Sequence, residues 1–214
     1  MKSLVFLGSV RESVPPRPMR LGERIASACA HHLVAMGIEV DVIDPMDIDQ
    51  SPPFKPHFSY AASQVPQDLD HLASRIASAD CYVAVSPEYN HSMSPALANL
   101  LNHFGSSLFS FKPSAIVTYS AGQWGGARAA VNMRTFLSEL GCLPVSAMIH
   151  IPHAQDVLDE DGSLLDGVDA TRWSGYFDRT FQQLVWWAAA ARAQHAVSEP
   201  TKGFKRDPSQ RNAP

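Results

Sequence analysis

Hydroxyl groups, an arginine and backbone amides follow the first apolar run of the chain. Residues 3–7 are apolar and end at Gly8, and the next five residues include Ser9, Arg11 and Ser13. Such side chains, together with N–H groups that lead into a helix, can hold a phosphate dianion. The segment lacks both the second glycine of a dinucleotide-binding turn and the lysine of a P-loop. It therefore predicts a monophosphate site, and the alternative is an ordinary turn with Arg11 in solvent.

A second loop with possible ligand-binding groups follows the apolar run 81–85. At its centre stand Pro87, Glu88, Tyr89 and Asn90. The proline stiffens the loop, the tyrosine offers an aromatic plane, and the asparagine amide offers both donors and acceptors. A planar heterocycle edged with carbonyls and ring nitrogens needs such groups. The alternative is a structural proline turn with a tyrosine on the surface.

A glycine-rich loop follows the apolar run 114–119. It starts at Ser120 and continues through Ala121, Gly122, Gln123, Trp124, Gly125, Gly126 and Ala127 to Arg128. Glycines let the backbone approach a ligand closely, and amides at the start of a helix favour negative charge. The alternative is a flexible surface loop. Three loops of this kind, each after a strand, are much less common by chance than one, and together they favour a ligand site.

Strands and helices that alternate along the chain would position these loops. Apolar or alternating runs predict strands at 3–7, 39–43, 81–85, 114–119 and 145–151, and helical spacing of apolar residues predicts helices around 21–36, 69–76, 96–104, 130–140 and 177–188. This order is typical of an α/β protein whose parallel sheet has helices on both faces. Ligands of such doubly wound sheets bind beyond the carboxyl ends of the strands, where the three loops lie.

Two segments stand outside this alternation. Residues 44–66 form a loop with five prolines that is longer than most unstructured loops, which indicates a function or an interface. Residues 198–214 are polar and contain three prolines, so we expect a disordered tail or an extended arm. The predicted organisation is one domain over 1–197 followed by this tail.

Composition excludes several classes of function. A net charge of -4 counts against a nucleic-acid binder, which normally has a basic surface. No run approaches the roughly 20 apolar residues of a membrane helix, and the first residues are too polar for a signal peptide. Three widely spaced cysteines fit a reducing compartment, so we expect a cytoplasmic protein. His150 and His153 have a proline between them and no acidic or cysteine cluster beside them, and we expect no metal site.

The motifs together resemble those of the NADPH-dependent FMN reductase family of flavodoxin-like proteins. The resemblance covers roughly residues 2–151 and is carried by Gly8–Arg11 with Arg20–Arg24, by Pro87–Asn90 with Ser92, Pro95, Leu97 and Asn99, and by Gly122 with Gly125–Arg128. The PEYN block is specific for the family, whereas the GSxR element alone is weak. The resemblance implies a flavodoxin-like, doubly wound, five-stranded parallel sheet of order 2-1-3-4-5.

The resemblance also implies a bound FMN. Its phosphate would meet Ser9, Arg11 and Ser13, and its ribityl chain and ring would meet Pro87, Glu88, Tyr89, Asn90, Ser120, Gly122, Gln123, Trp124 and Gly125. The chain departs from many relatives in residues 14–19, which lengthen the first loop and make Arg17 or Arg20 alternative phosphate ligands. Trp124 stands near a position where many relatives have glycine. It would lie near the flavin or second substrate, or cap a subunit interface.

The implied activity is transfer of a hydride from NADPH or NADH through FMN to a quinone, a free flavin or a similar acceptor by a ping-pong route. Because the cofactor carries this chemistry, no catalytic side chain is expected. A flavodoxin-type electron carrier and a scaffold that merely keeps FMN are the alternatives. A low charged fraction and the aromatic residues Trp173, Tyr176, Phe177, Trp186 and Trp187, together with the resemblance, predict a homodimer or homotetramer.

Overall fold

The computed structural model describes residues 1–11, 20–49 and 54–198. Its strands are β1 (Lys2–Leu7), β2 (Glu39–Ile43), β3 (Cys81–Pro87), β4 (Pro113–Tyr119), β5 (Leu143–Pro144) and β6 (Ile149–Ile151). Its α-helices are α1 (Leu21–Ala35), α2 (Gln67–Ser78), α3 (Pro95–Asn102), α4 (Ser106–Phe109), α5 (Ala127–Glu139) and α6 (Ala170–Val197). Short 3₁₀ turns lie at Pro45–Asp47, His57–Ser59, Ala62–Gln64 and Ala154–Asp156. The predicted tail lies outside the described residues except for Ser198.

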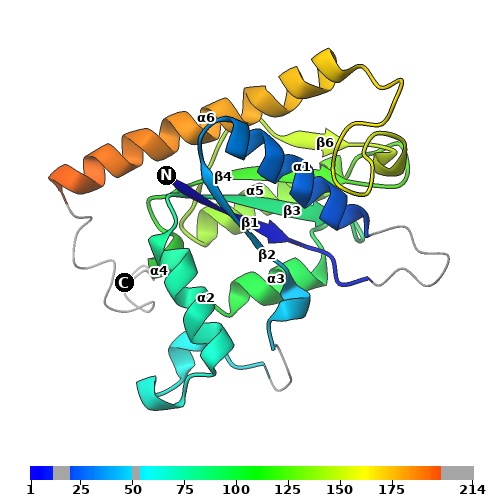
Figure 1. Ribbon diagram of the computed structural model, residues 1–214. Helices are drawn as coiled ribbons and strands as arrows, with labels where there is room; N and C mark the ends of the chain where they lie inside the picture. Colours follow the sequence, from blue (N-terminus) through cyan, green and yellow to red (C-terminus); the bar gives the residue numbers. More distant parts are fainter. Residues whose placement is uncertain (12–19, 50–53, 199–214) are drawn as a thin grey trace.

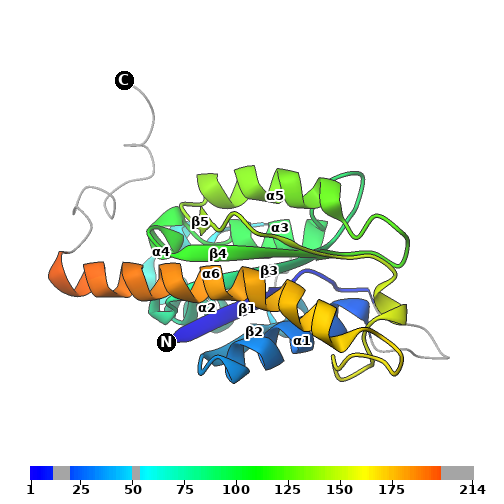
Figure 2. The same ribbon diagram turned by 90° about the horizontal axis from the view of Figure 1, so that it is seen from above.

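The strands form one parallel sheet in the order β2-β1-β3-β4-β5, and β6 also pairs with β4. Helices α1 and α6 cover one face, and α2, α3, α4 and α5 cover the other (Figures 1 and 2). Successive strand side chains point to opposite faces, so Val5 and Leu7 pack toward α1 and α6 while Leu4 and Phe6 pack toward α2, α3 and α4. The predicted doubly wound sheet and its order 2-1-3-4-5 are confirmed.

The predicted strand at 145–151 is too long, because only β6 lies within it, and a separate short strand, β5, precedes it. Between β5 and β6 the amide of Val145 still bonds to the carbonyl oxygen of Ser114 in β4, at 2.9 Å, but the groups that follow bond to side chains. Arg134 Nη2 donates to the carbonyl oxygens of Val145 and Ser146 at 3.0 and 2.9 Å, and Gln183 Oε1 accepts from the amide of Ala147 at 3.2 Å. These side chains satisfy backbone groups that a continuous strand would pair, so the ladder can break at little cost.

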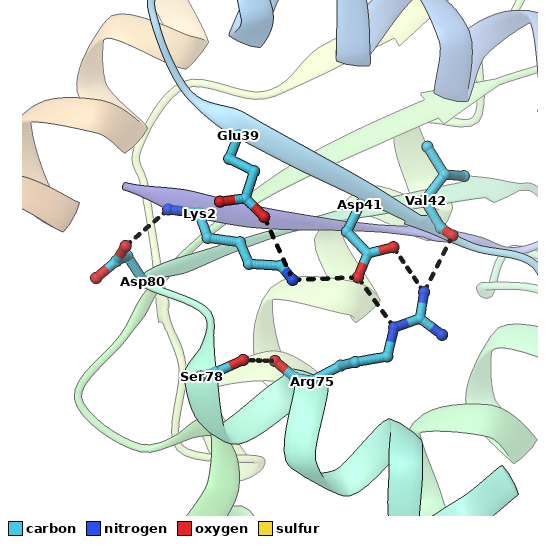
Figure 3. Close-up of polar contacts among 7 residues, drawn as sticks. All are labelled: Lys2, Glu39, Asp41, Val42, Arg75, Ser78 and Asp80. Carbon is cyan, nitrogen blue, oxygen red and sulfur yellow. Dashed lines mark hydrogen bonds and ion pairs between the residues drawn. The ribbon is translucent and has the colours of Figure 1, made fainter.

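Charged side chains tie α2 to the edge strand β2 (Figure 3). Arg75 donates two hydrogen bonds to the carboxylate of Asp41, at 2.9 and 2.6 Å, and Lys2 Nζ lies 3.5 Å from the same carboxylate. The hydrogen bonds from Arg75 hold the pKa of Asp41 below its ordinary value. Charges on an edge strand also oppose pairing with another sheet. The network thus helps to hold β2 at the edge.

Within the described ranges, no helix is both long and apolar enough to cross a membrane.

Candidate functional site

The loops that follow β1 and β3 are packed directly against each other. A Cβ atom on Gly8 would lie too close to the carbonyl oxygen of Val85, so a glycine is needed at this crossing. Ser94 begins α3 as its N-cap, and its hydroxyl donates to the carbonyl oxygen of Gly8 and accepts from the amide of Leu97 at 3.1 Å. One serine therefore caps a helix and joins the two loops.

The first loop forms a small cradle with β4 and α1. The hydroxyl groups of Ser9 and Tyr119 are hydrogen-bonded, and burial raises the pKa of Tyr119, so this phenol stays protonated. A Cβ atom on Gly22 would lie 2.7 Å from the Tyr119 oxygen and 2.9 Å from Ser9 Cβ. The start of α1 thus approaches the loop as closely as only glycine permits. Ser9 is half-buried and Arg11 is exposed, while Ser13 lies outside the described residues.

Arg20 uses all its donors inside the protein. Its Nε and Nη2 bond to Glu23 Oε1 at 2.8 and 2.7 Å, and Nη2 also bonds to Asp44. Its Nη1 donates to the Ser9 carbonyl oxygen at 2.5 Å and to Met46 Sδ at 3.0 Å. A guanidinium has five N–H donors, and these contacts account for all of them. In this arrangement Arg20 braces the first loop and has no donor left for a phosphate.

The second loop is a tight turn at Tyr89–Ser92. The amides and carbonyls of its two end residues exchange hydrogen bonds of 3.0 and 2.9 Å, and Asn90 and His91 have φ angles of 49° and 64°. Two positive φ angles at the centre define a type I′ turn, which is uncommon without glycine. Asn132 Nδ2 donates to the His91 carbonyl oxygen at 2.5 Å and holds the turn against α5. The turn leaves Tyr89 45% exposed.

The carboxylate of Glu88 joins the second loop to the third. Its Oε1 lies 2.6 Å from Arg128 Nη2, and its Oε2 accepts from the amide of Ala129 at 3.4 Å. This places the carboxylate at the start of α5, where the helix dipole favours a negative charge. The Arg128 guanidinium in turn lies 5.5 Å from the centre of the Trp124 ring. The side chain of Glu88 is therefore engaged with α5 and orders the residues beside Trp124.

Ser120 shapes the third loop. Its hydroxyl donates to the Gly122 carbonyl oxygen at 2.7 Å and accepts from the Gly125 amide at 2.9 Å. The Gly125 amide, which the sequence suggested as a donor to negative charge, is thus already bonded. Gly122, Gln123 and Trp124 are all exposed, and a Cβ atom on Gly122 would meet no atom within 4 Å. This part of the loop is open to a ligand.

Pro87 is the last residue of β3, and Tyr89, Gly122 and Trp124 lie on the loops that follow β3 and β4 at the carboxyl edge of the sheet. Sequence reasoning missed Tyr119, because the apolar pattern of β4 made its last residue look like core. It also missed Asp44 and Glu23, which hold Arg20. The only indication in the sequence was that these two acidic residues lie near strand and helix ends, where they can pair with an arginine.

No group of three or more His, Cys, Asp or Glu side chains that could hold a metal ion is found in the part of the chain that the structure describes. His150 Nδ1 lies 2.8 Å from Thr118 Oγ1, so one of its ring nitrogens is occupied by a neighbour. Burial lowers the pKa of His150.

Ser9 and the exposed Arg11 thus follow β1, and the exposed rings of Tyr89 and Trp124 follow β3 and β4. The model that describes the NADPH-dependent FMN reductase family matches residues 1–156. A relative named NAD(P)H-dependent FMN reductase, from Pseudomonas aeruginosa, is 35% identical over 105 residues, which are 47% of this chain and 57% of the relative. An NADPH azoreductase of a Bacillus species is 32% identical over 50% of this chain and 63% of its own. The chain thus spans less than two thirds of the length of both relatives.

Other matches cover more of the chain. A 2-hydroxy-1,4-benzoquinone reductase of a Burkholderia species is 28% identical over 77% of this chain and 86% of its own. FerB, a flavoenzyme NAD(P)H:(acceptor) oxidoreductase from Paracoccus denitrificans, has a similar solved structure, with a TM-score of 0.66 and 22% identity over 86% of this chain and 97% of its own. That likeness shows a common fold. Because the family model covers well over half of its length, this chain belongs to the NADPH-dependent FMN reductase family.

Proposed function

We propose that the protein is an FMN-dependent oxidoreductase that passes a hydride from NADPH or NADH to a quinone, a free flavin or a similar small acceptor by a ping-pong route. The observation that carries this proposal is the meeting of three loops at the carboxyl edge of the sheet. The first offers Ser9 and Arg11, and the others expose Tyr89 and Trp124. Membership of the family supports the same conclusion.

The residues present fit FMN as the cofactor. Ser9 and Arg11 would hold its phosphate, and Pro87–Asn90 and Gly122–Trp124 would line its ribityl chain and ring. Gly22 lets the start of α1 come close to Ser9, so the amides of this helix end lie beside the loop that would hold the phosphate. When bound, FMN supplies reversible hydride transfer, which no protein side chain offers.

The polypeptide orients and stabilises rather than reacts. The start of α5 lies beside the third loop, and the carboxylate of Glu88 already occupies its positive end, which fixes the position of this helix end. The bonds from Asn132 and Glu88 fix the second loop before a ligand arrives, which lowers the entropy lost on binding. Because Tyr89 and Trp124 leave one side accessible, we expect donor and acceptor to use the same face in turn.

Rapid mixing without oxygen tests the activity. The protein is first loaded with FMN and then mixed with NADPH or NADH, and we expect flavin absorbance to fall before any acceptor is added. Addition of a benzoquinone should restore it, and steady-state rates should give parallel double-reciprocal lines. If neither nicotinamide lowers the absorbance, the reductase proposal fails and the electron-carrier alternative replaces it. Converging lines would reject the ping-pong route alone.

We also propose a cellular compartment and an oligomeric state for the protein. Three cysteines that are free and buried fit a reducing cytoplasm. We expect a homodimer or homotetramer, and the structure refines the reason. Phe177 is buried against α1, whereas Trp186 and Trp187 are 61% and 50% exposed. Surplus apolar surface therefore lies in the second half of α6.

A further inference from the structure

The second half of α6 extends past the sheet with an apolar surface. Figures 1 and 2 show its last turns projecting beyond the other elements. From Trp186 to Val197 the sequence is WWAAAARAQHAV, and Arg192 is the only residue of fixed charge in it. An exposed helix normally carries polar residues on its outer face, and one that is apolar on most sides is normally covered. This half of α6 therefore has the composition of a buried helix.

A groove lies beside this helix end. It has a volume of about 360 Å³ and is bounded by Leu143 of β5 and by Trp187, Ala190, Ala191 and Gln194 of α6. Leu143 and Val197 are 53% and 83% exposed. Together with the two tryptophans they expose on the order of 500 Å². A stable interface needs roughly 800 Å² from each partner, so four side chains supply more than half of one side.

The exposed side of α6 has large side chains in one half and small side chains in the other, so two copies in antiparallel orientation would fit together. Each of residues 183, 186, 187, 190, 193, 194 and 197 has another of this set three or four positions away, so they share one side of the helix. Bulky side chains, Trp186 and Trp187, stand on one side of Ala190, and small Ala193 stands on the other. An antiparallel helix related by a two-fold axis at Ala190 would set the tryptophans of each copy against the second copy's Ala193 and Gln194.

We propose that this face of α6 is an interface with a second copy of the chain, packed antiparallel about a two-fold axis near Ala190. Alanines at the crossing allow the two helix axes to approach to about 8 Å. Arg192 is directed away from this side of α6, since its Nη1 lies 3.9 Å from Asp80 of the same chain. No like charges then face each other across the axis. The proposal gives a location to the oligomer proposed above and does not depend on flavin chemistry.

Light scattering on the full-length protein with single substitutions tests the interface. Wild type should have at least twice the 23.3 kDa of one chain at micromolar concentration. Ala190→Glu places two carboxylates together at the axis, and we expect at least a tenfold weaker dimer. Val131→Glu is the matched control, because Val131 is 63% exposed on α5, and its mass should equal that of wild type. Unchanged FMN affinity in Ala190→Glu would separate this interface from the proposed flavin site.

Cysteine oxidation tests the orientation. The native cysteines Cys29, Cys81 and Cys142 are buried, so an added surface cysteine reacts alone. Ala190→Cys should form a disulfide-linked dimer, because the two copies of residue 190 face each other. Ala193→Cys should not, since its two copies would lie about 9 Å apart along the axis.

Three results would overturn the proposal. The first is a wild-type monomer, which would mean that the groove is covered from within one chain. The second is a dimer that Ala190→Glu leaves intact, which would place the interface elsewhere. The third is cross-linking of Ala193→Cys in place of Ala190→Cys, which would reject the antiparallel two-fold.

Discussion

Arg20 Nη1 donates a hydrogen bond of 2.5 Å to the carbonyl oxygen of Ser9, while the rest of its guanidinium is held by Glu23, Asp44 and Met46. Arg20, the residue just before α1, thus holds the loop that follows β1 in place. Arg11, on the same loop, is exposed. The two arginines should therefore act differently, Arg11 on the ligand and Arg20 on the loop.

Arg11→Ala should weaken FMN binding roughly tenfold to a hundredfold, because a hydrogen bond to a charged group contributes about 1.5–3 kcal/mol. Titration of the apo-protein with FMN measures this change. Riboflavin, which lacks the phosphate, is the control ligand, and its affinity should be the same in wild type and variant. Equal losses for both ligands would show that Arg11 does not meet the phosphate.

Arg20→Met should destabilise the protein even without FMN. The change leaves the Ser9 carbonyl and two partly buried carboxylates without their donor, and we expect a loss of about 1–3 kcal/mol in the free energy of unfolding. Urea unfolding of the apo-protein measures it. Arg11→Ala serves as the matched control with an exposed arginine, and it should leave apo stability within about 0.5 kcal/mol. An Arg20→Met protein of full stability but weak FMN affinity would make Arg20 a direct ligand.

Asp41→Asn should make stability less dependent on pH. The pKa of Asp41 is lowered in the folded protein by Arg75, so its contribution is fully present above its ordinary value near 4 and is lost as the pH falls through the lowered value. Wild type should exceed the variant by about 1 kcal/mol at pH 7. Urea unfolding at pH 7 and at successively lower pH values should show this difference shrinking. A difference that grows on acidification would contradict the assignment.

Tyr89→Leu and Trp124→Leu should change the kinetics with a quinone acceptor more than the stability. Both side chains are exposed, at 45% and 63%, so their removal costs the folded core little. We expect a change of at least threefold in kcat/KM for a benzoquinone and a change in Tm of less than about 3 °C. Phe58→Leu, which alters a 57% exposed aromatic residue on another loop, is the control. Unchanged kinetics in both site variants would show that the quinone acceptor binds elsewhere on the protein.

The positions of the main elements and of the three loops follow from local patterns in the sequence. Apolar runs such as residues 81–85 need no distant partner to be recognised, because a strand buried on both faces is apolar along its whole length. Parallel strands then bring the loops at 8–11, 87–90 and 120–128 to one edge. The motifs of the three loops resemble those of the family, and this resemblance implied the strand order.

Which groups remain free for a ligand depends on contacts that form when the chain folds. Arg20, which the sequence offered as an alternative phosphate ligand, is bonded to Asp44, 24 residues away. The Gly125 amide is bonded to Ser120, and the Glu88 carboxylate is engaged by Arg128, 40 residues away. Residues 145–151 were predicted as one strand because their apolar pattern cannot reveal that Arg134 and Gln183 bond their backbone. Each of these outcomes depends on which donor meets which acceptor after the chain folds, and such a pairing leaves no local pattern in the sequence.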